Sequence, residues 1–233
     1  MIGDENPVIQ ERSNTIDFSK IMERVFLMMT LGLAITGLTS LMVVSIPEVL
    51  VFTIRSWPIW AIAELAVVII LSWNINNMGA NACRVSFIMY AIVNGITLST
   101  IFLLYEISSI YTTFFITAGM FICAAAYGKV TKCDLSKIGN ILFMALIGLI
   151  IAGIVNIFIM NNMLSFIISA IGIVIFVGIT AYDVQKIKAY SESMNVEDED
   201  VSTRVVTWGA LALYLDFVNL FLKLLRFFGK RKD

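Results

Sequence analysis

Seven long runs of apolar residues are the feature that most constrains the fold of this chain. A helix needs about 20 residues to cross the roughly 30 Å hydrocarbon core of a bilayer, and each run reaches or approaches that length. The runs are too uniformly apolar for the alternating strands of a membrane β-barrel. The sequence therefore predicts an all-α membrane protein, a bundle of seven transmembrane helices. The candidate spans are Val25–Ile46, Trp57–Trp73, Val85–Leu104, Tyr111–Tyr127, Ile138–Met160, Leu164–Tyr182 and Val205–Phe228.

Composition excludes several classes of protein. Of the 233 residues, 59% are hydrophobic and only 14% are charged, whereas soluble domains carry about 25% charged residues. There is no histidine, which excludes a Ser-His or Cys-His dyad, an HExxH zinc site and a haem-ligating histidine. The three cysteines, Cys83, Cys123 and Cys133, lack the CxxC spacing of zinc sites. We expect no cofactor, and no basic patch interleaved with aromatic residues predicts a nucleic-acid partner.

The chain divides into a polar N-terminal segment (residues 1–24), a membrane domain (25–229) and a basic tail (230–233). The N-terminal segment lacks the pattern of a cleaved signal peptide. With the N-terminus inside, the inner segments hold ten lysines and arginines, and the outer loops hold only Arg55. The basic tail conflicts with this orientation. Either the last run is re-entrant, or it spans the membrane against the charge bias.

Three acidic residues lie in or at the edge of apolar runs: Glu64, Asp183 and Asp216. An Asp at the centre of a membrane helix costs about 2.5–3.5 kcal/mol on insertion scales, so a partner, a shared proton or a bound cation must offset it. Asn219 and Lys223 follow Asp216 at i+3 and i+7, so a polar stripe shares one helix face with its carboxylate. The alternative is a structural aspartate, hydrogen-bonded to the backbone or to tyrosine hydroxyls.

The sequence leaves the roles of Asp183 and Glu64 open. Asp183 ends its apolar run, so it fits an interfacial charge beside Lys186 and Lys188 as well as a buried one. Glu64 lies seven residues inside its run and fits either a pairing with a base or a place on a vestibule. If two carboxylates met in the interior, they would share a proton, and their ionised form would suit a hard cation such as Ca²⁺.

Two motifs fix polar residues inside apolar runs. The stretches are FVGITAYDVQKIK (residues 176–188) and LALYLDFVNLFLKLLRFFG (211–229). Together they resemble the Bax inhibitor-1 (TMBIM) family, in the style of its bacterial members. The run around Glu64, NGITLSTIF (94–102) and FMALIGLIIAGIVNIFI (143–159) support the resemblance, which covers roughly residues 20–229.

The resemblance implies a seven-helix bundle in which the last helix is central. It implies that Asp183 and Asp216 face each other as a pH-sensing pair that governs a Ca²⁺ leak and holds Ca²⁺ transiently. It gives Glu64 a place on the cation path or at its gate. The expected partners are the lipid bilayer, calcium ions and protons, and the expected location is the bacterial inner membrane. Possible supporting residues are Tyr182, Tyr214, Arg84, Asn219 and Lys223.

One departure from the family pattern concerns an arginine that, in some members, follows the second apolar run and latches onto the aspartate pair. Here that stretch reads WNINNMGANAC, and the nearest arginine is Arg84. Arg84 substitutes for the latch, or Asn74 and Asn76 form a weaker neutral one, or the latch is absent. Without a guanidinium to stabilise the ionised pair, we predict a pH response at higher pH than in members that carry the arginine.

Three rival functions use the same residues. In a proton-coupled transporter the aspartates would carry protons, but Pro7, Pro47 and Pro58 all avoid the span centres, where transporters usually break their helices. In an intramembrane aspartyl protease the second aspartate sits in a GxGD turn, whereas no glycine opens the run before Asp216, so we expect no enzyme. A stress-related membrane protein could act through protein partners, which the sequence does not identify.

Overall fold

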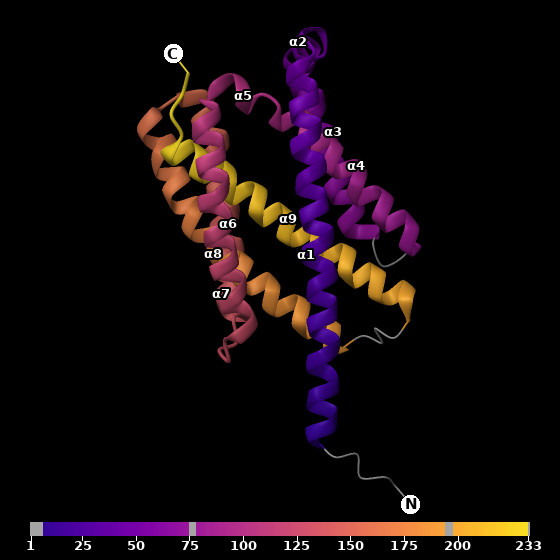
Figure 1. Ribbon diagram of the computed structural model, residues 1–233. Coiled ribbons are helices and arrows are strands. Elements are labelled where there is room, and N and C mark those ends of the chain that lie inside the picture. Colours follow the sequence, from indigo (N-terminus) through magenta and orange to yellow (C-terminus); the bar gives the residue numbers. More distant parts are fainter. Residues whose placement is uncertain (1–6, 75–77, 194–197, 233) are drawn as a thin grey trace, which may run out of the picture.

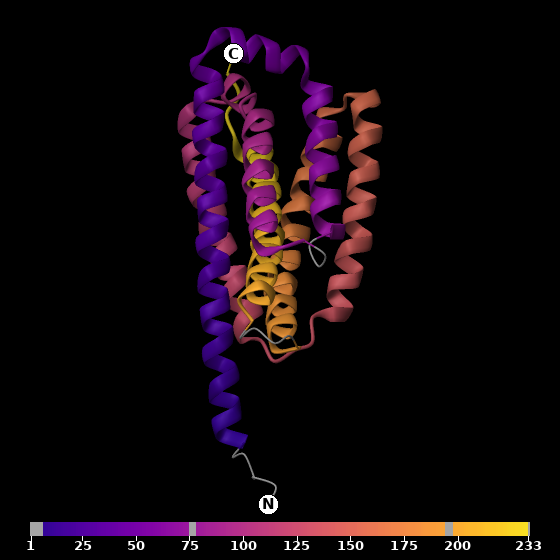
Figure 2. The same ribbon diagram turned by 90° about the vertical axis from the view of Figure 1, so that its right-hand side faces the viewer.

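The computed structural model describes residues 7–74, 78–193 and 198–232. These residues form an α-helical bundle (Figures 1 and 2). The helices are α1 (Pro7–Ser45), α2 (Pro47–Arg55), α3 (Trp57–Asn74), α4 (Ala80–Leu98), α5 (Ile101–Leu104), α6 (Ile107–Val130), α7 (Ser136–Ile159), α8 (Asn162–Ser193) and α9 (Glu199–Phe228). In Figure 1, α1 and α6 stand nearly upright and α9 crosses them obliquely.

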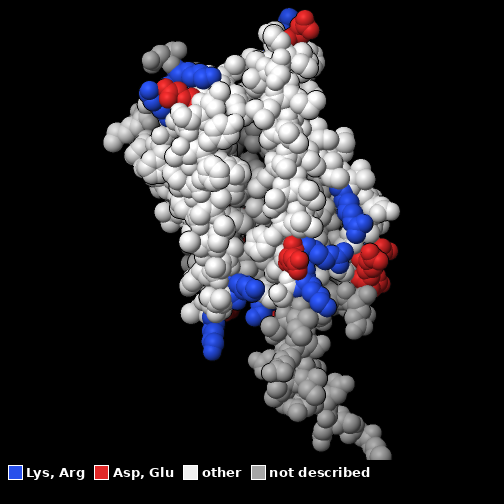
Figure 3. All heavy atoms as spheres, in the orientation of Figure 1, with Lys and Arg blue, Asp and Glu red and all other residues white. Residues whose placement is uncertain are grey.

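The predicted membrane spans are confirmed as helices. Six helical stretches are long and apolar enough to cross a bilayer, and the bent pair α2–α3 supplies a seventh if it is counted as one span. On the face that Figure 3 shows, charged side chains gather toward the two ends and leave an uncharged belt between them. This distribution suits a surrounding bilayer, because charges are costly in hydrocarbon.

Two segments expected to be loops are helical. The stretch PEVLVFTIRS contains α2, which begins at Pro47 and is bent by 76° from α3. Proline is pre-organised for the first turn of a helix, while Pro58 cannot donate in a helix interior and breaks the continuity between α2 and α3. Likewise α8 runs past Tyr182 to Ser193. Neither glycine nor proline interrupts it there, and Val184 and Ile187 are fully buried on its inner face.

The last helix is the core of the bundle, as the resemblance implied. In the most apolar stretch of α9, 72% of the residues are buried inside the protein, whereas in that of α7 only 6% are. The α9 side chains Ala210, Leu213 and Leu220 have no exposed surface. Helices α1, α4, α6 and α8 pack against it, and Figure 2 shows it running through the middle of the bundle. A polar side chain on α9 is therefore held away from lipid.

Helix α1 begins and helix α9 ends at opposite ends of the bundle (Figure 1). Helix α9 is unbroken over 30 residues, about 45 Å, so the re-entrant alternative is wrong and the last helix spans. The basic tail is fastened to the α5–α6 junction. Lys230 forms an ion pair with Glu106 at 2.8 Å, and the Lys232 ammonium donates to the Phe102 carbonyl at 2.8 Å. Part of the tail's positive charge is thus neutralised where it lies.

Candidate functional site: a buried aspartate pair

The structure brings Asp183 of α8 and Asp216 of α9 together. The two side chains are 7% and 4% exposed, and their carboxylates are close enough for their charges to interact. Asp183 is therefore enclosed by the protein rather than exposed on its surface. Its position ten residues before the end of α8 places it about 15 Å inside that helix.

Glycines allow the neighbouring helices to enclose this part of α8. Gly128 of α6 packs directly against the backbone of Ala181, so that a methyl group at Gly128 would overlap the Ala181 carbonyl. Gly139 of α7 lies against the ring of Tyr182. Close approach of backbones at small residues is how membrane helices gain contact area. Here it shields the segment that carries Asp183.

Thr180 is the hydrogen-bond partner of Asp216. Its hydroxyl donates to the Phe176 carbonyl at 2.8 Å and also forms a hydrogen bond with the Asp216 carboxyl. Thr180 stands three residues before Asp183 on one face of α8. Helix α8 therefore contributes both the hydroxyl and the carboxylate that act on Asp216.

Two further features surround the aspartate pair. Within the described part of the chain, the buried Oδ2 atom of Asp216 accepts no hydrogen bond. The cation that acts on Asp183 is Lys186, whose ammonium lies 5.2 Å from the centre of the Trp208 ring and 5.8 Å from that of Tyr182. Ring contacts hold that ammonium beside the pair.

Glu64 forms a separate polar site between α3 and α4. Its carboxylate accepts hydrogen bonds from Asn94, from the Thr97 hydroxyl at 2.9 Å and from the Tyr90 hydroxyl at 3.4 Å. The Tyr90 ring packs edge-on against Tyr214 of α9, with ring centres 5.8 Å apart. Tyr214 stands two residues before Asp216, and side chains so spaced do not share a helix face. Glu64 thus approaches α9 from a side other than that of the aspartate pair.

The predicted supporting residues are not assembled around the pair. Arg84 donates to the Thr203 hydroxyl at 3.0 Å, thirteen residues before Asp216, or about 20 Å along α9. It does not form the latch. Asn76 and the side chain of Asn74, the other latch candidates, lie outside the described residues.

The other supporting side chains have structural contacts of their own. Asn219 donates to the Leu215 carbonyl at 2.8 Å on its own helix. The hydroxyls of Tyr214 and Thr36 are hydrogen-bonded at 2.6 Å, so Tyr214 is not the partner of Asp216. The stem of Lys223 lies over Gly172, and Tyr182 packs against Gly139.

Sequence reasoning did not identify Thr180 or Gly128. Thr180 precedes Asp183 by three residues, a spacing that places both on one face of a helix, and a search for hydroxyls at that spacing would have found it. Gly128 carries no such signal, because its role depends on a contact with another helix.

The two carboxylates alone do not supply a complete coordination shell for Ca²⁺. Over the described ranges, no three Cys, Asp or Glu side chains converge on a point. Two carboxylates supply at most four oxygens, whereas bound Ca²⁺ takes six to eight. Water would have to complete the shell of any calcium ion at the pair.

Comparisons with known proteins agree with the motifs. The model of the family described as "Inhibitor of apoptosis-promoting Bax1" matches residues 18–233. The inner membrane protein YbhL of Escherichia coli is 44% identical over 214 residues, covering 91% of this chain and 92% of YbhL. A protein of Borreliella burgdorferi is 37% identical over 227 residues, covering 96% of this chain and 97% of its own. With its helical membrane fold and its two aspartate motifs, the chain belongs to the Bax inhibitor-1 family.

Proposed function

We propose that this protein is a pH-sensitive, calcium-permeable leak channel of the bacterial inner membrane, gated by protonation of Asp183 and Asp216. The observation that carries the proposal is the burial of two interacting carboxylates, from two helices, in the centre of the bundle. Two negative charges in a low-dielectric interior repel each other strongly, so the packing of α8 on α9 depends on how many protons the pair holds. The name of YbhL, an inner membrane protein, supports the location.

An apolar cluster supplies a barrier for such a gate. It lies between α7, α8 and α9, on the side of the pair toward the C-terminal end of α9. Its members Ile179 and Leu220 are close in sequence to Thr180 and Asp216. A hydrated cation cannot pass closely packed apolar side chains. Flux would require α8 and α9 to separate. The charge of the aspartate pair shifts the equilibrium between the packed and the separated arrangement of these helices. The cluster consists of Leu149, Ile168, Ile175, Phe176, Ile179, Leu220 and Leu224.

Calcium flux into proteoliposomes across a pH series tests this function. We expect wild-type flux to change with pH and the flux of Asp183→Asn and Asp216→Asn to lose that change, because an amide cannot titrate. Asp134→Asn is the matched control. Asp134 is an exposed carboxylate whose pKa is lowered by its hydrogen bonds with Ser136, so it stays ionised near neutral pH. Unchanged pH dependence in both pair variants would contradict the proposal and favour a protein that acts through partners.

The pH midpoint of that flux tests the absence of the arginine latch. Since the guanidinium of Arg84 lies at Thr203, we keep the prediction that the response occurs at higher pH than in family members with the arginine. The two proteins would be compared in the same liposomes. An equal or more acidic midpoint for this chain would contradict it.

A proton-coupled cation transporter is the second candidate, favoured by the burial of two interacting carboxylates, which are groups that can carry protons. A transporter would move protons against calcium in a fixed ratio, whereas a channel would conduct calcium under a voltage with no proton counterflow. Helix α9 is unbroken at Asp216, which supports the channel and our proposal that the protein is not a protease.

A further inference from the structure

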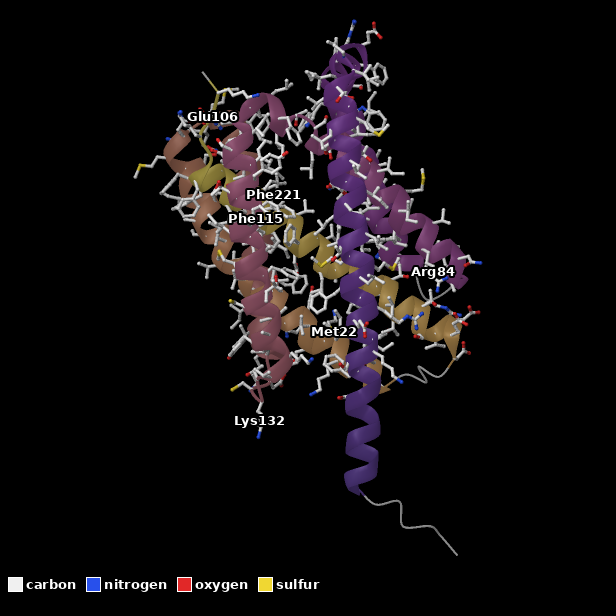
Figure 4. All side chains as sticks on the ribbon, in the orientation of Figure 1. Met22, Arg84, Glu106, Phe115, Lys132 and Phe221 are labelled. Carbon is white, nitrogen blue, oxygen red and sulfur yellow. The ribbon has the colours of Figure 1, made fainter. Side chains whose placement is uncertain are left out.

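A small basic hollow lies among α1, α4 and α9, far from the aspartate pair. Its volume is about 150 Å³, and it is lined by Arg24, Arg84 and Thr203 together with apolar residues of α1 and α9. Figure 4 shows Arg84 on the side of α4 that faces the start of α9, and Figure 3 shows blue side chains gathered at this corner of the molecule. Two guanidinium groups thus border one hollow.

Both arginines have neutral partners. Arg24 donates to the Ser202 hydroxyl at 2.9 Å, and Arg84 donates to the Thr203 hydroxyl at 3.0 Å. Among the described residues the one ion pair is that of Lys230 with Glu106. A guanidinium carries five N–H donors, so each arginine keeps donors for a further acceptor. Planar guanidinium groups bind phosphate oxygens in pairs.

Acidic side chains stand near this corner without lining the hollow. Glu23 precedes Arg24 on α1, and Glu199 and Asp200 form the first turn of α9. All three are exposed, so solvent screens them. The surface that an incoming ligand would touch is made of arginine, threonine and apolar side chains.

The apolar wall of the hollow indicates which phosphate would bind. Leu27 and Leu31 line it and are 63% and 57% exposed. They are four residues apart, so they form one outward stripe on α1. Next to the two arginines the protein therefore presents a surface for hydrocarbon. A free phosphate ion would leave that surface unused, whereas a phospholipid would cover it with an acyl chain.

We propose that Arg24 and Arg84 bind the phosphate of an anionic phospholipid whose acyl chain lies along Leu27 and Leu31. The hollow lies toward the end of the bundle where α1 begins, which the count of lysines and arginines assigns to the cytoplasm. Basic pockets between membrane helices on that side bind the headgroups of anionic lipids. The bound lipid would connect α1 and α4 to the start of α9. This site does not depend on the calcium function.

Lipid competition on the full-length protein in detergent tests the site. Native mass spectrometry would compare the binding of phosphatidylglycerol and phosphatidylcholine offered in equal amounts. One basic residue near a membrane surface contributes about 1 kcal/mol to anionic lipid binding, or about a fivefold preference. We expect Arg24→Gln and Arg84→Gln each to lower the preference for phosphatidylglycerol about fivefold, and the double variant to lower it about 25-fold.

The controls separate this site from general attraction between charges. Arg55→Gln removes an exposed arginine from α2 at the other end of the bundle and should leave the preference unchanged. Phosphatidylcholine binding and the circular dichroism spectrum report whether each variant is folded. If the double variant does not fold, Arg84→Gln alone tests the site, because Arg84 is exposed.

Three outcomes would overturn the proposal. The first is a double variant that prefers phosphatidylglycerol as strongly as the wild type does. The second is an equal loss of preference in Arg55→Gln. The third is displacement of the lipid by inorganic phosphate or glycerol 3-phosphate at similar concentration, which would assign the hollow to a soluble anion.

Discussion

Alanine at Gly128 is expected to lower the free energy of unfolding by about 3 kcal/mol, the upper end of the usual cost of overpacking. A Cβ atom on Gly128 would meet the carbonyl oxygen and carbon of Ala181 at distances that real Cβ atoms essentially never show, and would lie 3.0 Å from its Cα. A backbone cannot rotate aside as a side chain can. Helix α6 would have to move away from α8, two residues before Asp183, and the enclosure of the aspartate pair would loosen.

The measurement is unfolding of the purified protein in detergent, followed by circular dichroism. Gly119→Ala is the matched control on the same helix, since a Cβ there would have nothing within 4 Å. Because alanine is the better helix former, that variant should be neutral or slightly more stable. Equal stability of the two variants would show that Gly128 of α6 does not pack directly against the backbone of Ala181 in α8.

Gly139→Ala provides an intermediate case. Its Cβ would lie 2.6–2.8 Å from atoms of the Tyr182 ring, which is a side chain and can turn. We expect a cost of about 1 kcal/mol, at the low end of overpacking, in the same unfolding measurement. A cost as large as that of Gly128→Ala would indicate that the Tyr182 ring is held as rigidly as a backbone.

Much of this fold could be predicted because a bilayer leaves few alternatives. Runs of the right length must be helices, since every backbone polar group needs a partner in hydrocarbon. The helical path of α2 and the extension of α8 to Ser193 escaped prediction because polar residues resemble a loop when only hydropathy is considered. The spanning course of α9 was one of two alternatives, and the charge rule alone could not decide between them while the ion pair of Lys230 with Glu106 was unknown.

The site was predictable only in part, for a different reason. The cost of burying a carboxylate singles out Asp216 from its position in the chain, but periodicity does not report which helices touch. The meeting of Asp183 with Asp216 came from family resemblance. Contacts that join distant parts of the chain, such as Thr180 with Asp216 and Arg84 with Thr203, needed the structure.

Leucine at Glu64 is expected to lower the free energy of unfolding by about 2 kcal/mol. The change leaves the Tyr90 hydroxyl and the Asn94 amide without their acceptor, and both residues are 2% exposed. A buried polar group without a partner costs about 1–3 kcal/mol. The expected total lies at the low end of the summed range for the two groups, because polar groups of an unfolded chain in a membrane also find hydrogen-bond partners. Thr97 keeps its bond to the Asn94 carbonyl at 2.8 Å.

Glutamine at the same position separates the structural role of Glu64 from a role in ion movement. Its amide oxygen can accept from Asn94, and its shape is that of glutamate, so Glu64→Gln should cost less than half as much stability as Glu64→Leu. Glu48→Leu, at an exposed carboxylate of α2, is the control and should be near neutral. If the glutamine variant unfolds like the wild type yet conducts less calcium, the charge of Glu64 acts on the cation path. If leucine costs no stability, the hydrogen bonds between α3 and α4 do not hold the two helices together.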